Sequence, residues 1–363
     1  MMPLTLSRYF AARFLSVVTA VFAGVFVLVV LLDYVELMRR ASDAPNVSAW
    51  LVAKTSFFRV PQVTERLLPF AVLVGAMTCY LNLSRRHELV IARSAGMSAW
   101  QFVAPAALVA LVLGVLAATV YNPLSAAMRE QSKRLEADLF GERQSALRPT
   151  GGSFWVRQKS AEGQSIINAT SSREQGSLLG GVTVLAFDPS GRFRERIEAK
   201  SAELEAGRWR LEQARVYASG SQTREFESYA LSTNLTPEQV RESFATPETV
   251  SFWELPQYIE TAEQAGLLAA GYRLQYQLLL ARPLLLAAMV MLAACVSLRF
   301  FRFGGVSVMV LSGVGAGFLL YVLSKVTEDL SKAELMHPMA AAWLPVLVGG
   351  LSGIVVLLYQ EDG

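Results

Sequence analysis

Two neighbouring arginines, Arg39 and Arg40, are the first side chains whose chemistry stands out, because they follow closely on a long apolar run that ends at Leu32. Guanidinium groups bind phosphate through paired hydrogen bonds, and cations at the mouth of a membrane span meet anionic lipid headgroups. The other interpretation is a solvated helix end whose charge is offset by acids nearby. Both interpretations stay open at this point. The acids concerned are Asp33, Glu36 and Asp43.

A second candidate is the polar stretch at residues 84–98, which separates two apolar runs. Its apolar positions recur at helical spacing, which predicts a short helix. Such a helix is too small for a domain, and its basic flank favours the cytoplasmic side. It could protrude there as a contact for a soluble partner. An ordinary loop with one helical turn is the alternative. The residues concerned are Arg85, Arg86, His87, Glu88, Leu89, Ala92, Arg93 and Ala95.

The residue types that usually catalyse reactions or bind metals do not occur at the spacings that such sites need. His87 and His337 have no metal-ligand or nucleophile partner nearby in sequence, and Cys79 and Cys295 lie inside apolar runs, where they are interpreted as small buried hydrophobes. The chain also lacks the Gly-x-x-x-x-Gly-Lys-Ser/Thr sequence of a P-loop, so it does not hydrolyse ATP by such a loop of its own. We therefore predict a non-catalytic chain with no cofactor and no metal.

Composition places the chain among membrane proteins. Its 363 residues are 53% hydrophobic and only 17% charged, with a mean hydropathy of +0.37, which is too apolar for a soluble protein of this size. The net charge of +3 is small and spread out, so nothing indicates nucleic-acid binding. Six uncharged runs approach the length of about 20 residues that a helical span needs. They are residues 14–32, 67–83, 100–121, 284–298, 306–324 and 339–359.

The charges around these runs predict the topology. Six crossings bring both termini and residues 84–98 to one side, which carries many arginines and almost no acids, as cytoplasmic loops do. The long polar insert is then outside. The first outside loop opposes this assignment, because it holds Arg39, Arg40, Lys54 and Arg59. No acid, base or histidine lies at the centre of a run, which argues against ion-coupled transport.

The spacing of apolar residues changes along the insert, from a helical period to a period of two. Asn122 and Pro123 are expected to cap a helix that continues the third span as an amphipathic helix. Period-two segments then predict an antiparallel sandwich or open roll, and a capping box at Ser251 predicts a helix over residues 251–265. The expected strands are residues 154–156, 165–169, 182–187, 192–197, 202–205, 208–211 and 224–233.

This order of segments resembles one family. Three spans, an outside β-domain, three more spans and the string SRRHELVIARSAGMS after the second span are similar, over essentially the whole chain, to the LptF/LptG permeases of lipopolysaccharide export. Local strings are more similar to the LptG branch than to the LptF branch. These strings are DYVELMRR at 33–40, NLTP at 234–237, GYRL at 271–274 and YQEDG at 359–363.

The resemblance implies a fold and an assembly. The fold would be an α+β membrane protein with six transmembrane helices in two groups of three and an inserted periplasmic antiparallel β-jellyroll. The domains would be 1–122 (first transmembrane half, with a coupling helix in 84–98), 123–275 (periplasmic helix, β-jellyroll and connecting helix 251–265) and 276–363 (second half). The chain would pair with an LptF-like paralogue, an LptB ATPase dimer would dock from the cytoplasm, and LptC would add a helix and a β-domain.

The resemblance also implies roles for residues of this chain. Lipopolysaccharide would enter from the outer leaflet of the inner membrane, between the first span of one chain and the fifth of its paralogue, and leave into a periplasmic bridge of β-jellyrolls. Asp33 stands where some relatives carry a further basic residue, which leaves the number of phosphate contacts open. The implied lipid contacts are Phe26, Leu32, Arg39 and Arg40; the implied coupling residues are Arg86, Glu88, Leu89, Arg93 and Gly96.

Two other functions stay open. The chain could be a mechanotransmitting subunit of an ABC-type machine, which relays the strokes of an ATPase to an outside partner and does not itself carry lipid. A membrane-bound enzyme is the remaining alternative, and the lack of a triad, metal set or carboxylate pair near the membrane disfavours it.

Overall fold

The computed structural model describes residues 4–41, 48–147, 154–160, 163–173, 178–188, 192–205, 207–218, 222–233, 247–264, 269–301 and 306–362. The chain forms two compact units. The first, here called the helical unit, comprises Met1–Leu139, Ser251–Trp253 and Arg273–Gly363. The second, the sheet unit, comprises Phe140–Val250 and Glu254–Tyr272.

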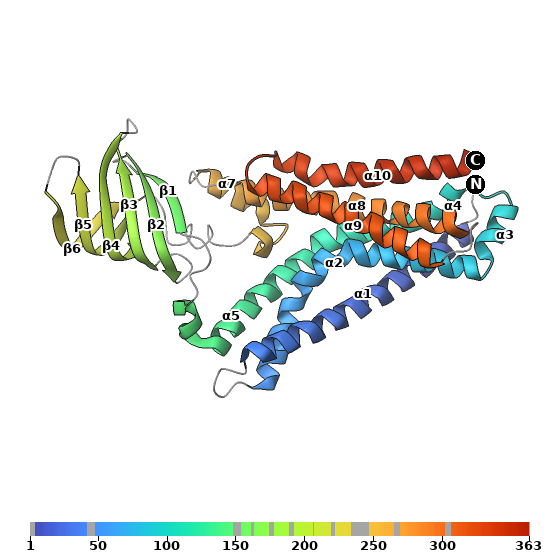
Figure 1. Ribbon diagram of the computed structural model, residues 1–363, viewed down its shortest axis with the longest axis horizontal. Coiled ribbons are helices and arrows are strands. Elements are labelled where there is room, and N and C mark those ends of the chain that lie inside the picture. Colours follow the sequence, from blue (N-terminus) through green and yellow to red (C-terminus); the bar gives the residue numbers. More distant parts are fainter. Residues whose placement is uncertain are drawn as a thin grey trace. The chain divides into compact units, whose positions relative to one another are not determined.

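Six described helices are long and apolar enough to cross a membrane, which confirms the six predicted spans. Each helix continues past its apolar run, so polar residues at the ends of the runs are also helical. The start of α1, the end of α10 and the short helix α3 lie at the same end of the helical unit (Figure 1). The helices are α1 (Leu4–Ala41), α2 (Ala49–Arg85), α3 (Glu88–Ser94), α4 (Ala99–Leu116), η1 (Ala117–Tyr121), α5 (Asn122–Leu147), α8 (Ala270–Phe301), α9 (Val306–Lys332) and α10 (Pro338–Asp362).

The third span is continuous with the helix that follows it, and the predicted cap at Asn122 is wrong. Asn122 has helical angles, φ −62° and ψ −50°, so the chain passes from α4 through the π-helical turn η1 into α5. Pro123 has no N–H to donate to the carbonyl of Thr119, four residues earlier. The indole Nε1–H of Trp253 donates to that carbonyl instead, at 3.0 Å.

Small residues let the spans approach closely. A Cβ built on Gly114 of α4 would lie 2.3 Å from the Cα of Pro283 in α8, so these two backbones touch. On α9, a Cβ on Gly317 would lie 2.3 Å from Leu73 of α2, whereas one on Gly315 meets nothing within 4 Å. Helices in lipid associate by this kind of packing, because the hydrophobic effect gives them little reason to associate.

The described strands form one six-stranded antiparallel sheet in the order β1-β2-β3-β4-β5-β6, which confirms an antiparallel β insert. The two strands expected at 192–197 and 202–205 are a single strand, β4, in which the inward alternation runs on to Ala199 and changes phase before the buried Ala202. The strands are β1 (Phe154–Ser160), β2 (Gly163–Arg173), β3 (Leu178–Phe187), β4 (Phe193–Glu205), β5 (Arg208–Ala218) and β6 (Arg224–Ser232).

The sheet is curved into an open roll around a buried tryptophan. Trp209 of β5 is fully buried, and its Nε1–H donates to Oε1 of Gln158 in β1 at 3.2 Å. The hydroxyl of Thr233, just after β6, donates to the same oxygen at 2.6 Å. Because β1 and β5 are not neighbours in the sheet, these bonds require it to bend until its two edges approach. Of the two predicted arrangements, the described strands therefore adopt the open roll.

The connecting helix begins later than predicted. Helix α7 runs over Leu255–Gln264, and Ser251 does not cap a helix that starts at Phe252. The backbone N–H of Phe252 donates to Oδ1 of Asn122 at 2.9 Å, and Trp253 is bound to Thr119, so this stretch is held in a turn against the helical unit. The predicted end of the helix at Ala265 and the NLTP string at 234–237 lie outside the described residues.

The contact between Gly114 and Pro283 gives a stability prediction. Gly114→Ala inserts a methyl group between two backbones that cannot easily move apart, so we expect destabilisation of about 1–3 kcal/mol. A thermal unfolding series of the detergent-purified chain measures it. Gly315→Ala is the matched control, because it makes the same change in an open position. Equal melting temperatures for the two variants would show that α4 and α8 are not in contact.

Candidate functional site

The arginines at the end of α1 share one carboxylate. Arg39 donates from Nη2 to Oε2 of Glu36 at 2.8 Å, and Arg40 donates from Nε to Oε1 of the same residue at 2.7 Å. The three side chains are solvent-accessible, and together they carry one net positive charge. Of the acids expected to offset the arginines, Glu36 therefore does so directly, and Asp43 lies outside the described residues.

Helix α1 presents a long apolar surface that the other described residues leave largely uncovered. Only 6% of its most apolar window is buried, and Leu32 is 63% exposed. Phe26 is half-buried and makes an edge-to-face contact with Phe57 of α2, with ring centroids 6.2 Å apart. Leu32 is thus open to an apolar neighbour, whereas Phe26 is partly occupied within the chain. Other exposed apolar residues of α1 include Val27, Leu28, Leu31 and Val35.

Asp33 belongs to a second charged group, which joins α1, α2 and α5. Its Oδ1 lies 3.4 Å from Nε of Arg59, and Nη1 of Arg59 lies 3.6 Å from Glu136. Arg129 also reaches Glu136, at 3.4 Å. Sequence reasoning did not find Arg129 and Glu136; the signal was their spacing of two helical turns on the extension of the third span.

The polar stretch at 84–98 contains a short helix, α3, whose seven residues exceed the single helical turn of the alternative interpretation. Left-handed residues bound it, His87 with φ 61° and Gly96 with φ 83°. Leu89 and Ala92 are buried against the helical unit. Arg86, Arg93 and Ala95 are exposed, so the predicted apolar face ends one turn early.

Glu88, the implied coupling acid, is in the first turn of α3 and is held by α1. The hydroxyl of Tyr9 donates to its Oε2 at 2.9 Å. This bond orients the Glu88 side chain but does not involve Oε1. Glu88 can therefore still accept a hydrogen bond from a partner. Arg86 and Arg93 flank it on the exposed side of the same short segment.

The helical unit contains a group of buried polar residues that the sequence did not predict. Glu65 of α2 is 5% exposed and forms an ion pair with Arg282 of α8. It also accepts hydrogen bonds from Nδ2 of Asn122 at 2.9 Å and from the hydroxyl of Ser125 at 2.5 Å. Glu65 and Arg282 each stand two residues before an uncharged run, so a search of the centres of the runs could not find them. These four residues are called the Glu65 cluster below.

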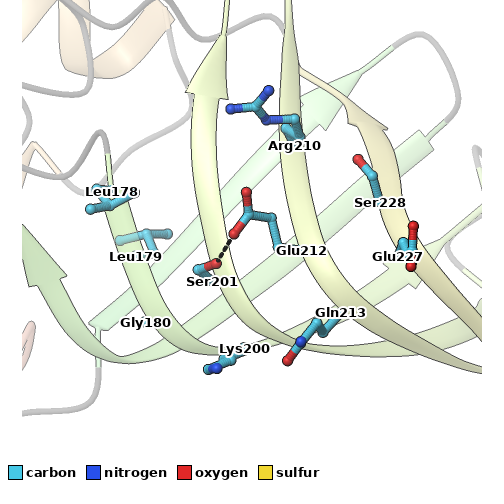
Figure 2. Close-up of a pocket in the computed structure, with 10 residues that line it drawn as sticks. All are labelled: Leu178, Leu179, Gly180, Lys200, Ser201, Arg210, Glu212, Gln213, Glu227 and Ser228. Atoms are coloured by element: carbon cyan, nitrogen blue, oxygen red, sulfur yellow. Dashed lines mark hydrogen bonds between the residues drawn. The ribbon is translucent and has the colours of Figure 1, made fainter.

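The sheet unit has a polar hollow on its outer face. Figure 2 shows the residues of β3, β4, β5 and β6 that line it. The hollow has a volume of about 730 Å³. Two of its charged groups have partners: Ser201 donates to Glu212 at 2.9 Å, and the hydrogen bond with Glu203 raises the pKa of Arg210. Within the described residues no group of three or more His, Cys, Asp or Glu side chains could hold a metal ion. The hollow offers no catalytic arrangement.

Comparison with known proteins agrees with this architecture. The family described as lipopolysaccharide export system permease LptF/LptG matches residues 8–359. The chain is 24% identical over 344 residues to the lipopolysaccharide export system permease protein LptG of Escherichia coli strain K12, a match that covers 91% of this chain and 92% of that protein. It is 23% identical over 357 residues to the protein of the same name from Haemophilus influenzae, with 95% of each covered.

These matches confirm the resemblance found in the sequence, and both relatives carry the LptG name, as the local strings predicted. The family match extends from the first of the six apolar helices, through the antiparallel sheet, to the last helix of this chain. The chain belongs to the LptF/LptG family of lipopolysaccharide export system permeases.

Proposed function

We propose that this chain is one transmembrane half of an ABC transporter of the bacterial inner membrane. It extracts lipopolysaccharide from the outer leaflet and passes it to a periplasmic bridge of β-jellyrolls, with the sheet unit on the periplasmic side. It has no ATPase of its own: an LptB dimer docks at α3, an LptF-like paralogue supplies the other half, and LptC completes the complex.

The observation that carries the proposal is the surface of α1. The helix exposes an apolar face along the bilayer and ends in the guanidinium groups of Arg39 and Arg40. An amphiphile with several acyl chains and phosphorylated sugars has the complementary order of apolar and anionic parts. Helix α9 is the other weakly buried span, with 22% of its window buried. In the proposal, α1 and the paralogue's counterpart of α9 form the lateral entrance.

Energetics requires the separate ATPase. Removal of an acyl chain from a bilayer costs about 0.8 kcal/mol for each methylene that leaves the apolar phase. Extraction of several chains therefore needs both an apolar path and an energy source. The chain offers a docking feature for such a source in α3, whose buried Leu89 and Ala92 fix it to the spans. A push on α3 is thus delivered directly to the spans whose apolar core includes Leu89.

The arginine pair gives the first functional prediction. Arg39→Glu with Arg40→Glu places two further carboxylates beside Glu36, so electrostatic repulsion should reduce photo-crosslinking of lipopolysaccharide at α1 to background. Glu36→Gln should leave crosslinking at or above the wild-type level, because it removes the carboxylate charge that competes with phosphate for both arginines.

Arg192→Glu with Arg194→Glu is the charge-matched control, since Arg192 directly precedes β4 and Arg194 is its second residue, both in the sheet unit. Wild-type crosslinking of the Arg39/Arg40 variant would remove the pair from the lipid site. If no lipid is captured at α1 even in the wild-type complex, the subunit transmits force without carrying lipid.

Glu88 gives the second functional prediction. Glu88→Arg reverses the charge offered to the ATPase, and we expect lipopolysaccharide-stimulated ATP turnover of the assembled complex to be lost while the chain still inserts. Tyr9→Phe removes only the hydrogen bond that orients the carboxylate, so turnover should fall less than with Glu88→Arg. Glu334→Arg makes the same charge change at the exposed connection between α9 and α10 and should have no effect. Unchanged coupling in Glu88→Arg would contradict the assignment.

A further inference from the structure

The Glu65 cluster satisfies a buried carboxylate almost completely. Both oxygens of Glu65 accept: Oε1 from Asn122 and Arg282, and Oε2 from Ser125. Glu65, Asn122 and Ser125 are each at most 5% exposed. A carboxylate at this depth is tolerated because an opposite charge and several donors compensate its lost hydration. The cluster joins three helices, α2, α5 and α8.

Asn122 extends the cluster to a fourth segment of chain. Its amide group donates through Nδ2 to Glu65, and its Oδ1 accepts the backbone N–H of Phe252 at 2.9 Å. Only one orientation of the amide serves both partners, because a carboxylate can only accept and a backbone N–H can only donate. Glu65 therefore determines which end of Asn122 faces Phe252.

The segment bound in this way is Ser251–Trp253, here called the return segment, through which the chain re-enters the helical unit. Its second anchor is the bond from Trp253 to the Thr119 carbonyl in η1. That carbonyl is available because Pro123 has no N–H to offer it. Stacking of Phe252 on Tyr276 of α8, with ring centroids 5.6 Å apart, is the third. All three anchors lie on the π-helical turn, the start of α5 or α8.

We propose that Glu65 is a positioning residue which, through Asn122, clips the return segment to the spans, so that a shift between α2 and α8 is passed to the chain that leads into α7. This deepens the proposed function, on which its consequence for coupling rests. The ion pair with Arg282 neutralises Glu65, whereas the clip depends on an acceptor at position 65. π-Helical turns inside α-helices are frequent at functional sites, and this one supplies the carbonyl that the return segment uses.

Two double variants separate the acceptor from the charge. Glu65→Leu with Arg282→Leu removes both charges and the acceptor, and an apolar pair of similar size is often tolerated in place of a buried ion pair. Glu65→Gln with Arg282→Met also removes both charges but keeps a carbonyl oxygen for Asn122. Amide hydrogen exchange of the full chain in its nanodisc-embedded complex, followed on peptides that contain Phe252, reports the clip directly.

We expect the Leu/Leu variant to accelerate exchange at Phe252 about three- to tenfold, the factor for the net loss of one hydrogen bond. The Gln/Met variant should stay within about twofold of wild type by the same reasoning. Thr327→Val is the control for loss of a buried hydrogen bond elsewhere in the spans, since Thr327 donates to the carbonyl of Ala341 at 2.9 Å, and it should leave Phe252 unchanged. If the Leu/Leu variant does not insert, Asn122→Leu carries the same expectation.

The second readout is the ratio of lipopolysaccharide-stimulated to basal ATP turnover. It should fall in the Leu/Leu variant with the ATPase still bound and recover in the Gln/Met variant. Wild-type exchange in both Leu/Leu and Asn122→Leu would overturn the clip, as would equal acceleration in Leu/Leu and Gln/Met. Accelerated exchange with an unchanged turnover ratio would overturn the coupling role. Absence of stimulated turnover in the wild-type complex refutes the proposed function alone, because exchange at Phe252 does not depend on it.

Discussion

Polar groups inside an apolar medium have to find partners within the protein, and this requirement shapes the helical unit more than any other. Prolines strengthen this requirement, because each one removes a backbone N–H donor from a helix. Pro123 leaves the Thr119 carbonyl without its helical donor, and Pro69 cannot donate to the backbone carbonyl of Glu65. For the Thr119 carbonyl, a donor that is distant in sequence takes the missing place, the indole of Trp253. A proline within a span and a contact between remote segments are thus two aspects of one constraint.

Apolar surface, which has no such need for partners, is left most exposed on one helix of the described chain, α1. Helices α2, α4 and α8 fill the interior of the helical unit, and Gly114 and Pro283 bring two of them into backbone contact. Few residues in the apolar window of α1 are buried. A helix that is apolar and little covered gains its stability from lipid or from a neighbouring molecule rather than from this chain. In the proposed function this is an advantage, because a lateral entrance must be able to separate from what it faces.

Local patterns were enough to predict the elements, and they failed where remote partners decide. Uncharged runs predicted the six spans, and period two predicted the antiparallel insert. The helix proposed from Ser251 starts at Leu255, because Asn122 takes the Phe252 N–H. Glu65 and Arg282 lie at the edges of apolar runs, where a charged residue usually marks the end of a span. Only their approach across α2 and α8 shows that they are buried, and no local pattern contains that information.

The arginine pair illustrates how an internal partner changes the meaning of a motif. Sequence alone left lipid contact and a solvated helix end as alternatives for Arg39 and Arg40, but the pairing with Glu36 makes the two compatible. A phosphate that binds there has to displace a carboxylate that is already in place, so net attraction is weaker than for two unpaired guanidinium groups. Exposed ion pairs of this kind exchange easily and are screened by salt. Since a transport site must also release its cargo, an arginine pair with a resident carboxylate suits transfer better than one that holds phosphate tightly.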